Sequence, residues 1–182
     1  TGRLLGKSTC DIRIRTPKPE HFEQSSEDIW HACCQAVREA LFAAGSVEVK
    51  GIAFDATCSL VVLGEGDLPL HVGADMPDAV PTAASHGALG EGELTFNVIM
   101  WCDHRATAEA DAITASGHRL LSYVGGAVSS EMEMPKLAWL KRWRPRTYRS
   151  ARRFLDLADY LAYRARDGHA GGAGCRSINT VV

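Results

Sequence analysis

The stretch GIAFDATCSLVVL, residues 51–63, decides the fold, because it begins and ends as a buried strand does and is polar in its middle. Its apolar ends, 52–54 and 60–63, predict two buried strand segments. A tight turn at the edge of a sheet is then expected from the small polar residues Asp55, Thr57, Cys58 and Ser59. Such a turn can present a carboxylate and hydroxyls to a polyol. It can equally be stabilised by Asp and Ser side chains that bond their own backbone, and spacing alone leaves both interpretations open.

Length and charge set limits on the class of protein. A chain of 182 residues is enough for one domain with a substantial core. Its 20 Lys and Arg against 22 Asp and Glu give a net charge of -2, which argues against nucleic-acid or anionic-membrane partners. No apolar run is long enough to span a membrane, and the six cysteines form no CxxC pair that would suggest a zinc site. We therefore expect a cytoplasmic protein with reduced thiols and no bound metal of its own, whose ligand is small and neutral or polar.

Strand and helix patterns alternate along the chain. Alternation predicts a half-buried strand over 10–15, and an apolar run predicts a buried strand over 96–101. Helices are expected from Ser25 to Gly45, over 105–117, from Pro135 onward, and from 148 to about 166. Residues 64–95, rich in Gly, Ala and Pro, predict a long surface loop or flexible insertion. Interleaved strands and helices favour an α/β domain in which helices cover a sheet.

The segment WCDHRA, residues 101–106, is a second candidate for a binding site. It places an aromatic ring, a carboxylate and a guanidinium after a predicted strand, at a sheet edge where open α/β folds bind ligands. Asp103 can instead cap the following helix and pair with Arg105, and without other information this second interpretation is favoured. Trp101 is harder to explain structurally, because flat aromatic surfaces suit the apolar faces of sugars. His104 is the one histidine of interest, with a solvated or hydrogen-bonded role favoured.

Charges near the predicted helix at Pro135 have two interpretations. Glu131, Glu133 and Lys136 flank its start, where charged side chains are usually solvated. The basic run KRWRPRTYRSARR, residues 141–153, is typical of an exposed helix face in a chain that is nearly neutral overall.

Four ordered motifs resemble one known family. GIAFDATCSLVVL, NVIMWCDHRA, SYVGGAVSSEMEMPKLAWLKRW and FLDLADYLAYRA are similar, in this order, to the first domain of the FGGY carbohydrate kinases, and TCSLV resembles the string that marks their D-ribulokinase branch. EQSSEDIWHACCQAVREAL resembles an earlier helix of that domain, so the resemblance covers nearly all of the chain outside 64–95 and 168–174.

The resemblance implies both a fold and an activity. The fold would be an actin-like, ribonuclease-H-like ATPase domain with a mixed sheet and flanking helices, incomplete at both ends of residues 1–182. The activity would be transfer of a phosphoryl group from ATP, with Mg²⁺, to a hydroxyl of a pentulose such as D-ribulose, with a carboxylate as general base. Positions carried over as substrate-binding are the turn Asp55, Ala56, Thr57 and Cys58, then Trp101, Asp103 and Arg105, and with them Glu131.

The resemblance also implies that this chain lacks parts of the enzyme. The family's Asp-x-Gly-Thr phosphate turn, its catalytic aspartate and its second, nucleotide-binding domain are all expected outside residues 1–182. We therefore expect a fragment that carries no catalytic residue and is inactive alone, whose partners are a sugar and the missing C-terminal domain. The alternative is a non-catalytic fragment that binds a sugar or another protein.

Overall fold

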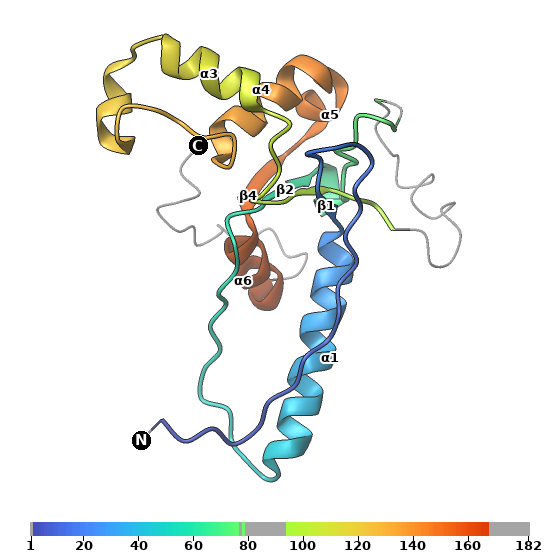
Figure 1. The fold of residues 1–182 in the computed structure, drawn as a ribbon. Helices are drawn as coiled ribbons and strands as arrows, with labels where there is room; N and C mark the ends of the chain where they lie inside the picture. The colour runs from blue at the N-terminus through green and yellow to red at the C-terminus, as the bar shows by residue number, and fades with distance from the viewer. Residues whose placement is uncertain (1, 77, 79–93, 168–182) are drawn as a thin grey trace.

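The computed structural model describes residues 2–76, 78 and 94–167. Its centre is a sheet of β1 (Glu23–Gln24), β2 (Leu60–Leu63), β3 (Val98–Ile99) and β4 (Arg153–Asp156), in the order β1-β3-β2-β4 (Figure 1). Every pairing between these strands is antiparallel. The described part of the sheet therefore shows only the antiparallel portion of the mixed sheet that the resemblance implies.

Strand β2 lies between two hydrophobic cores. Val61 and Leu63 face a core that includes residues of α1 (Ser26–Ala44) and α6 (Leu157–Asp167). Leu60 and Val62 face a second core on the side of α4 (Glu133–Trp143). Successive strand residues point to opposite faces, so a strand buried on both faces must be continuously apolar. The buried strand predicted over 60–63 is confirmed.

The other half of the opening stretch is not a strand. Residues 46–58 run as an extended segment beside α1 (Figure 1), and the side chain of Ile52 is 63% exposed. The strand predicted over 52–54 is therefore wrong, and the polar block leads into β2 instead of joining two strands. The strand predicted over 10–15 is also wrong. It is reduced to a bridge between Arg15 and Glu23, and Ile14 stays exposed because no core lies opposite it in the described part.

Helix α1 matches its prediction closely, with Ser25 at its N-cap and Gly45, at a φ of 77°, at its C-cap. Only its first half packs on the sheet. Ile29 and Ala32 are buried, whereas the apolar residues Val37 and Leu41 are exposed where the helix extends beyond the sheet (Figure 1).

The remaining helices lie at the other end of the sheet or follow β4. Helix α3 (Thr107–Ala115) and the 3-10 helix η2 (Arg119–Val124) pack beside α4, and α5 (Pro145–Ser150) leads into β4. The continuous helix predicted over 148–166 is wrong, because β4 interrupts it and pairs with all four residues of β2. The basic run is not one exposed helix face either, since Arg144 and Thr147 are buried.

The described part of the predicted loop over 64–95 is ordered and packed. After η1 (Glu65–Asp67), Leu70 and Val72 enter the core, and the Leu70 N–H donates to the Val62 carbonyl at 3.2 Å. For these residues the prediction of a surface loop is wrong. Residues 79–93 and Cys175 lie outside the described residues.

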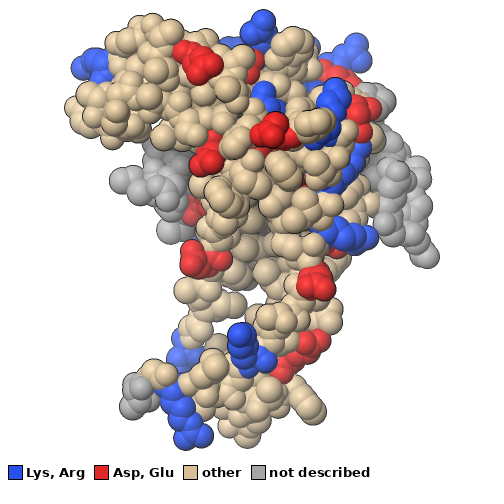
Figure 2. Space-filling model, in the orientation of Figure 1, with Lys and Arg blue, Asp and Glu red and all other residues tan. Residues whose placement is uncertain are grey.

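The distribution of charge on the face drawn in Figure 2 agrees with the nearly neutral net charge of the chain. On the face drawn in Figure 2, acidic and basic side chains are interspersed. None of the described helices is long and apolar enough to cross a membrane.

Candidate functional site

Two of the segments predicted to bind substrate meet where β2 begins and β3 ends. Because these strands are antiparallel and Leu60 is paired with Ile99, Ser59 lies beside Trp101. The Trp101 N–H donates to Ser59 Oγ at 3.2 Å, and Ser59 Oγ lies 3.3 Å from Thr57 Oγ1. Thr57 and Trp101, which are 44 positions apart in the sequence, are thus joined through one buried serine.

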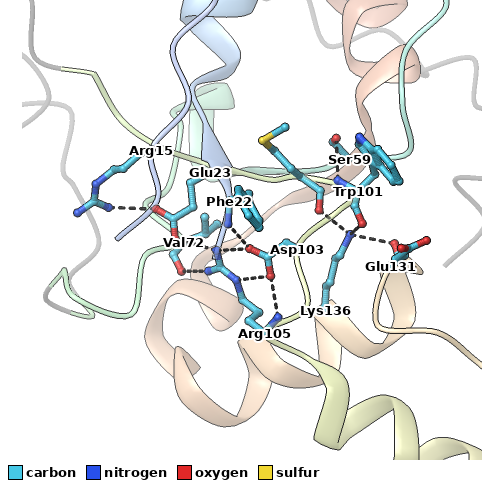
Figure 3. A network of polar contacts seen from close by, with 11 residues as sticks. Arg15, Phe22, Glu23, Ser59, Val72, Trp101, Asp103, Arg105, Glu131 and Lys136 are labelled. Carbon is cyan, nitrogen blue, oxygen red and sulfur yellow. Dashed lines mark hydrogen bonds and ion pairs between the residues drawn. The ribbon is translucent and has the colours of Figure 1, made fainter. Parts of the chain in front are cut away.

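Lys136 holds this meeting point together from a third direction. Its side chain enters from the first turns of α4, and its Nζ donates to the carbonyls of Met100 at 2.8 Å, Trp101 at 3.4 Å and Glu131 at 2.9 Å (Figure 3). Burial lowers the pKa of the Lys136 ammonium, while nearby Asp103, Cys58 and Glu133 oppose that change. The prediction of a solvated charge at a helix end is therefore wrong for Lys136, which is fully buried.

The residues that meet here are called the strand-end cluster: Thr57, Ser59, Trp101, Glu131 and Lys136. Figure 3 labels the last four of them. Trp101 is 40% exposed, and Thr57 is exposed as well. An aromatic face beside hydroxyl and carbonyl groups offers stacking and both kinds of hydrogen-bonding group. This combination suits a neutral polyol better than a charged ligand, because the lysine is already bound to three carbonyls.

The extended segment before β2 also carries the other predicted turn residues, Asp55, Ala56 and Cys58, and these three differ in their surroundings. Asp55 and Cys58 are exposed. Ala56 packs against the core between α1 and α6, so its side chain faces away from solvent. The predicted turn is therefore present only as an extended segment that reaches the cluster at Thr57.

Asp103 and Arg105 form a buried ion network next to the cluster (Figure 3). Arg105 Nη2 lies 2.7 Å from Asp103 Oδ2 and 2.9 Å from Glu23 Oε1, and Arg105 Nη1 donates to the Val72 carbonyl at 3.2 Å. Asp103 Oδ1 also accepts from the backbone N–H of Arg105 at 3.0 Å, and its Oδ2 accepts from the N–H of Phe22 at 2.7 Å. The favoured pairing of Asp103 with Arg105 agrees with the structure, whereas the predicted helix cap does not, because α3 has Ala106 at its N-cap.

This network fixes the backbone around the cluster. The side chains of Asp103, Arg105 and Glu23 are all 0% exposed. Burial raises the pKa of the Glu23 carboxyl, and the guanidinium groups of Arg105 and Arg15 oppose that rise. Charges so deeply buried are retained only when they are paired and hydrogen-bonded. Their geometry supports a role in shaping the site through the backbone on both sides of Trp101.

His104 contacts the side chain of Glu131, the residue whose carbonyl joins the cluster through Lys136, and both side chains are partly exposed. His104 Nδ1 lies 3.0 Å from Glu20 Oε2, and Nε2 lies 3.4 Å from Glu131 Oε1. Hydrogen bonding to Glu131 and then to Glu20 raises the pKa of the His104 imidazole. The hydrogen-bonded role favoured for this histidine agrees with the structure.

Glu133 belongs to an acidic group that the sequence did not indicate. Its carboxyl stands at the start of α4 near Asp156, Asp159 and Lys136, and burial followed by the charge of Asp156 raises its pKa to about 7. Burial also raises the pKa of Asp156. Among the described residues, however, no three His, Cys, Asp or Glu side chains are placed to hold a metal ion, so we assign no step through Mg²⁺ to this chain.

One signal in the sequence points to Lys136. A cation in the first turns of a helix is unfavourable against the helix dipole, so a lysine beside Pro135 needs another reason to be there. The structure supplies it in the three carbonyls of the cluster. Ser59 belongs to the polar block of the opening stretch, but its contact with Trp101 follows only from the strand pairing.

Two apolar hollows lie away from the cluster. One, of about 260 Å³, is lined by α1, the 52–54 segment and Ala165. The other, of about 690 Å³, lies between α3, η2 and Met134. Neither is lined by the residues predicted to bind substrate.

The described part of the chain is thus a sheet flanked by helices, with an aromatic and polar cluster at the strand ends. No protein-family model matches the chain. An FGGY carbohydrate kinase domain-containing protein of Xenopus laevis is 38% identical over 182 residues, which is 100% of this chain and 29% of that relative. A D-ribulokinase of Saccharomyces cerevisiae is 39% identical over 168 residues, 91% of this chain and 21% of that relative.

A solved sugar kinase structure has a similar fold. The crystal structure of a xylulose kinase from Brucella ovis matches with a TM-score of 0.63 at 22% identity, covering 84% of this chain and 27% of that one. The resemblance to the FGGY carbohydrate kinases and their D-ribulokinase branch is thereby confirmed, and so is the actin-like α/β fold. The chain spans 29% to 30% of the length of the first curated relatives that it matches.

Proposed function

We propose that this chain is the sugar-binding part of an ATP-dependent carbohydrate kinase that phosphorylates a hydroxyl of a pentulose, with D-ribulose as the foremost candidate. The observation that carries the proposal is the hydrogen bond from the backbone N–H of Trp101 to Ser59 Oγ, which joins the backbone of this exposed tryptophan to the serine that also contacts Thr57. The 39% identity to a protein named a D-ribulokinase supports the choice of sugar.

Each predicted residue has a proposed role. The Trp101 ring stacks on the apolar face of the sugar, and the exposed residues Asp55, Thr57 and Cys58 hydrogen-bond its hydroxyls on one side. Ala56, which packs against the core, offers only its backbone groups. Glu131 accepts a hydrogen bond from a sugar hydroxyl on the other side. Asp103 and Arg105 contribute indirectly, because their polar groups are bound within the buried network.

The chemistry of phosphoryl transfer is proposed to need more than this chain. Such transfer depends on a positioned base, on neutralisation of phosphate charge and on a bound metal. We propose that the catalytic base and the contacts to ATP and Mg²⁺ come from the rest of a longer protein, with a further domain of the same polypeptide as the partner. The 182-residue chain by itself is then expected to bind sugar weakly and to leave ATP unchanged.

Calorimetry of the chain with D-ribulose, L-ribulose, D-xylulose and ribitol tests the proposal. A buried hydrogen-bonding site rejects a wrongly oriented hydroxyl strongly, so one sugar should bind at least about tenfold more tightly than the others. Trp101→Ala should weaken that binding by about tenfold, whereas the control Tyr123→Ala, at an exposed ring in η2, should not. Equal affinity of wild type and Trp101→Ala would refute the site. Absence of binding to all four sugars would favour the alternative of a protein-interaction fragment, for which the exposed apolar hollows are the supporting observation.

A further inference from the structure

The backbone of His104 is held rigidly between β3 and α3. Its N–H donates to the Glu20 carbonyl at 3.0 Å, and its own carbonyl accepts from Thr107 Oγ1 at 2.8 Å. The imidazole therefore projects from a fixed point, with Glu20 on one side and Glu131 on the other.

The two carboxylates make the same demand on the two ring nitrogens, since each needs a hydrogen-bond donor. An ionised carboxylate can only accept a hydrogen bond, so each nitrogen of His104 must carry a proton to satisfy both Glu20 and Glu131. A neutral imidazole carries one proton and would turn a lone pair toward the other carboxylate. The bridge is therefore complete only when His104 is the imidazolium ion.

Glu131 is the member of the strand-end cluster that this bridge restrains. Its carbonyl is held by Lys136 and its N–H by Ser129 Oγ at 3.2 Å, while His104 holds its carboxylate. The backbone contacts are independent of the state of His104. Loss of the imidazolium would therefore release the carboxylate and leave the backbone of the cluster in place.

We infer that His104 is a positioning residue: as the imidazolium ion it holds the Glu131 carboxylate at the strand-end cluster, and polyol binding there weakens as the imidazolium loses its proton. This inference rests on the proposed function. The pKa of His104 lies above its ordinary value of 6.5, so the bridge is complete below that pH and is lost as the pH rises through the higher folded value. The side chains of His104, Glu20 and Glu131 are 42%, 65% and 45% exposed, and exposed pairs are weak, so the expected loss of affinity is roughly two- to fivefold.

The buried charged groups near the bridge already have their own partners. Asp103 and Arg105 are closed within their buried network, and the Lys136 ammonium faces three carbonyls. Lys18 lies on the same turn as Glu20. Glu133 has a pKa of about 7 and so titrates over the same range as His104, which requires a control.

The first measurement is an NMR titration of the His104 imidazole in the sugar-free chain. Its pKa should lie above the ordinary value and should fall toward it in both Glu131→Gln and Glu20→Gln, more in Glu131→Gln because Glu131 is the larger cause. A His104 that titrates identically in wild type and Glu131→Gln would overturn the inference.

The second measurement is the dissociation constant for D-ribulose at about pH 6 and about pH 9, on either side of the ordinary histidine pKa. In a Glu133→Gln background, which removes the other titrating group, affinity should fall two- to fivefold over this range. Adding His104→Gln should abolish that change, whereas His31→Gln, at an exposed histidine on α1, should preserve it. An unchanged pH dependence in His104→Gln overturns the inference and leaves the proposed function standing. Absence of D-ribulose binding at both pH values refutes the proposed function, and the role of His104 in binding falls with it, whatever the NMR titration shows.

Discussion

Replacing Glu133 by Gln should stabilise the chain by an amount that grows as the pH rises from about 4.5 to about 7. The Glu133 carboxyl stands near Asp156 and Asp159, and its Oε1 is buried without a hydrogen-bond partner among the described residues. A pKa of about 7 in place of 4.5 means that the folded state resists ionisation of this group by about 2.5 pH units. At about 1.4 kcal/mol per unit, ionising Glu133 costs the folded state at most about 3 kcal/mol.

The sign follows from the direction of the pKa change. A carboxyl with a raised folded pKa binds its proton more tightly in the folded state, so its contribution to stability is present below about pH 4.5 and is lost as the pH rises through about 7. Gln has nearly the same shape and never ionises. Glu133→Gln should therefore match wild type at about pH 4.5 and exceed it by up to about 3 kcal/mol at about pH 8.

Urea unfolding followed by tryptophan fluorescence at pH values from about 4.5 to about 8 measures this difference. The matched control is Glu48→Gln, at a carboxylate whose side chain is 77% exposed, and its effect should not vary with pH in this way. A gain for Glu133→Gln that is the same at every pH, or a wild-type stability that does not fall between pH 5 and pH 8, would refute the reasoning.

Two further predictions concern the buried network and the central strand. Arg105→Ala leaves the Asp103 and Glu23 carboxylates buried without their main cation. We therefore expect urea unfolding to show a free energy of unfolding that is about 3–5 kcal/mol lower. A loss below about 1 kcal/mol would show that the network does not support the fold. Leu60→Ala opens a cavity at a fully buried position of β2 and should lower the free energy of unfolding by about 2–5 kcal/mol. The control Leu4→Ala, at a residue that is 74% exposed, should lower it by less than about 0.5 kcal/mol. Similar effects of the two changes in the same assay would contradict the placement of β2 at the centre of the sheet.

Sequence reasoning located the candidate site better than it described the structure around it. It selected Thr57 and Trp101 because polar and aromatic residues there adjoin apolar runs, and the structure joins both through Ser59. It assigned Lys136 to solvent, because helix ends are usually exposed and nothing local shows three carbonyls converging on one ammonium. Which of these residues contact a sugar stays a prediction.

The sequence by itself determined those features whose cause is local. The run Leu60–Leu63 has to be buried on both faces because every residue in it is apolar, and α1 lies between Ser25 and Gly45 because both residues favour helix ends. Only the tertiary structure decided that residues 153–156 form strand β4. The strand begins at Arg153 and ends at Asp156, and these polar residues hide the strand pattern in the sequence. It pairs with β2, whose residues lie more than 80 positions earlier in the chain. It also decided the burial of Lys136, because burial and pairing depend on what other segments bring to the same place, and a local pattern carries no information about that.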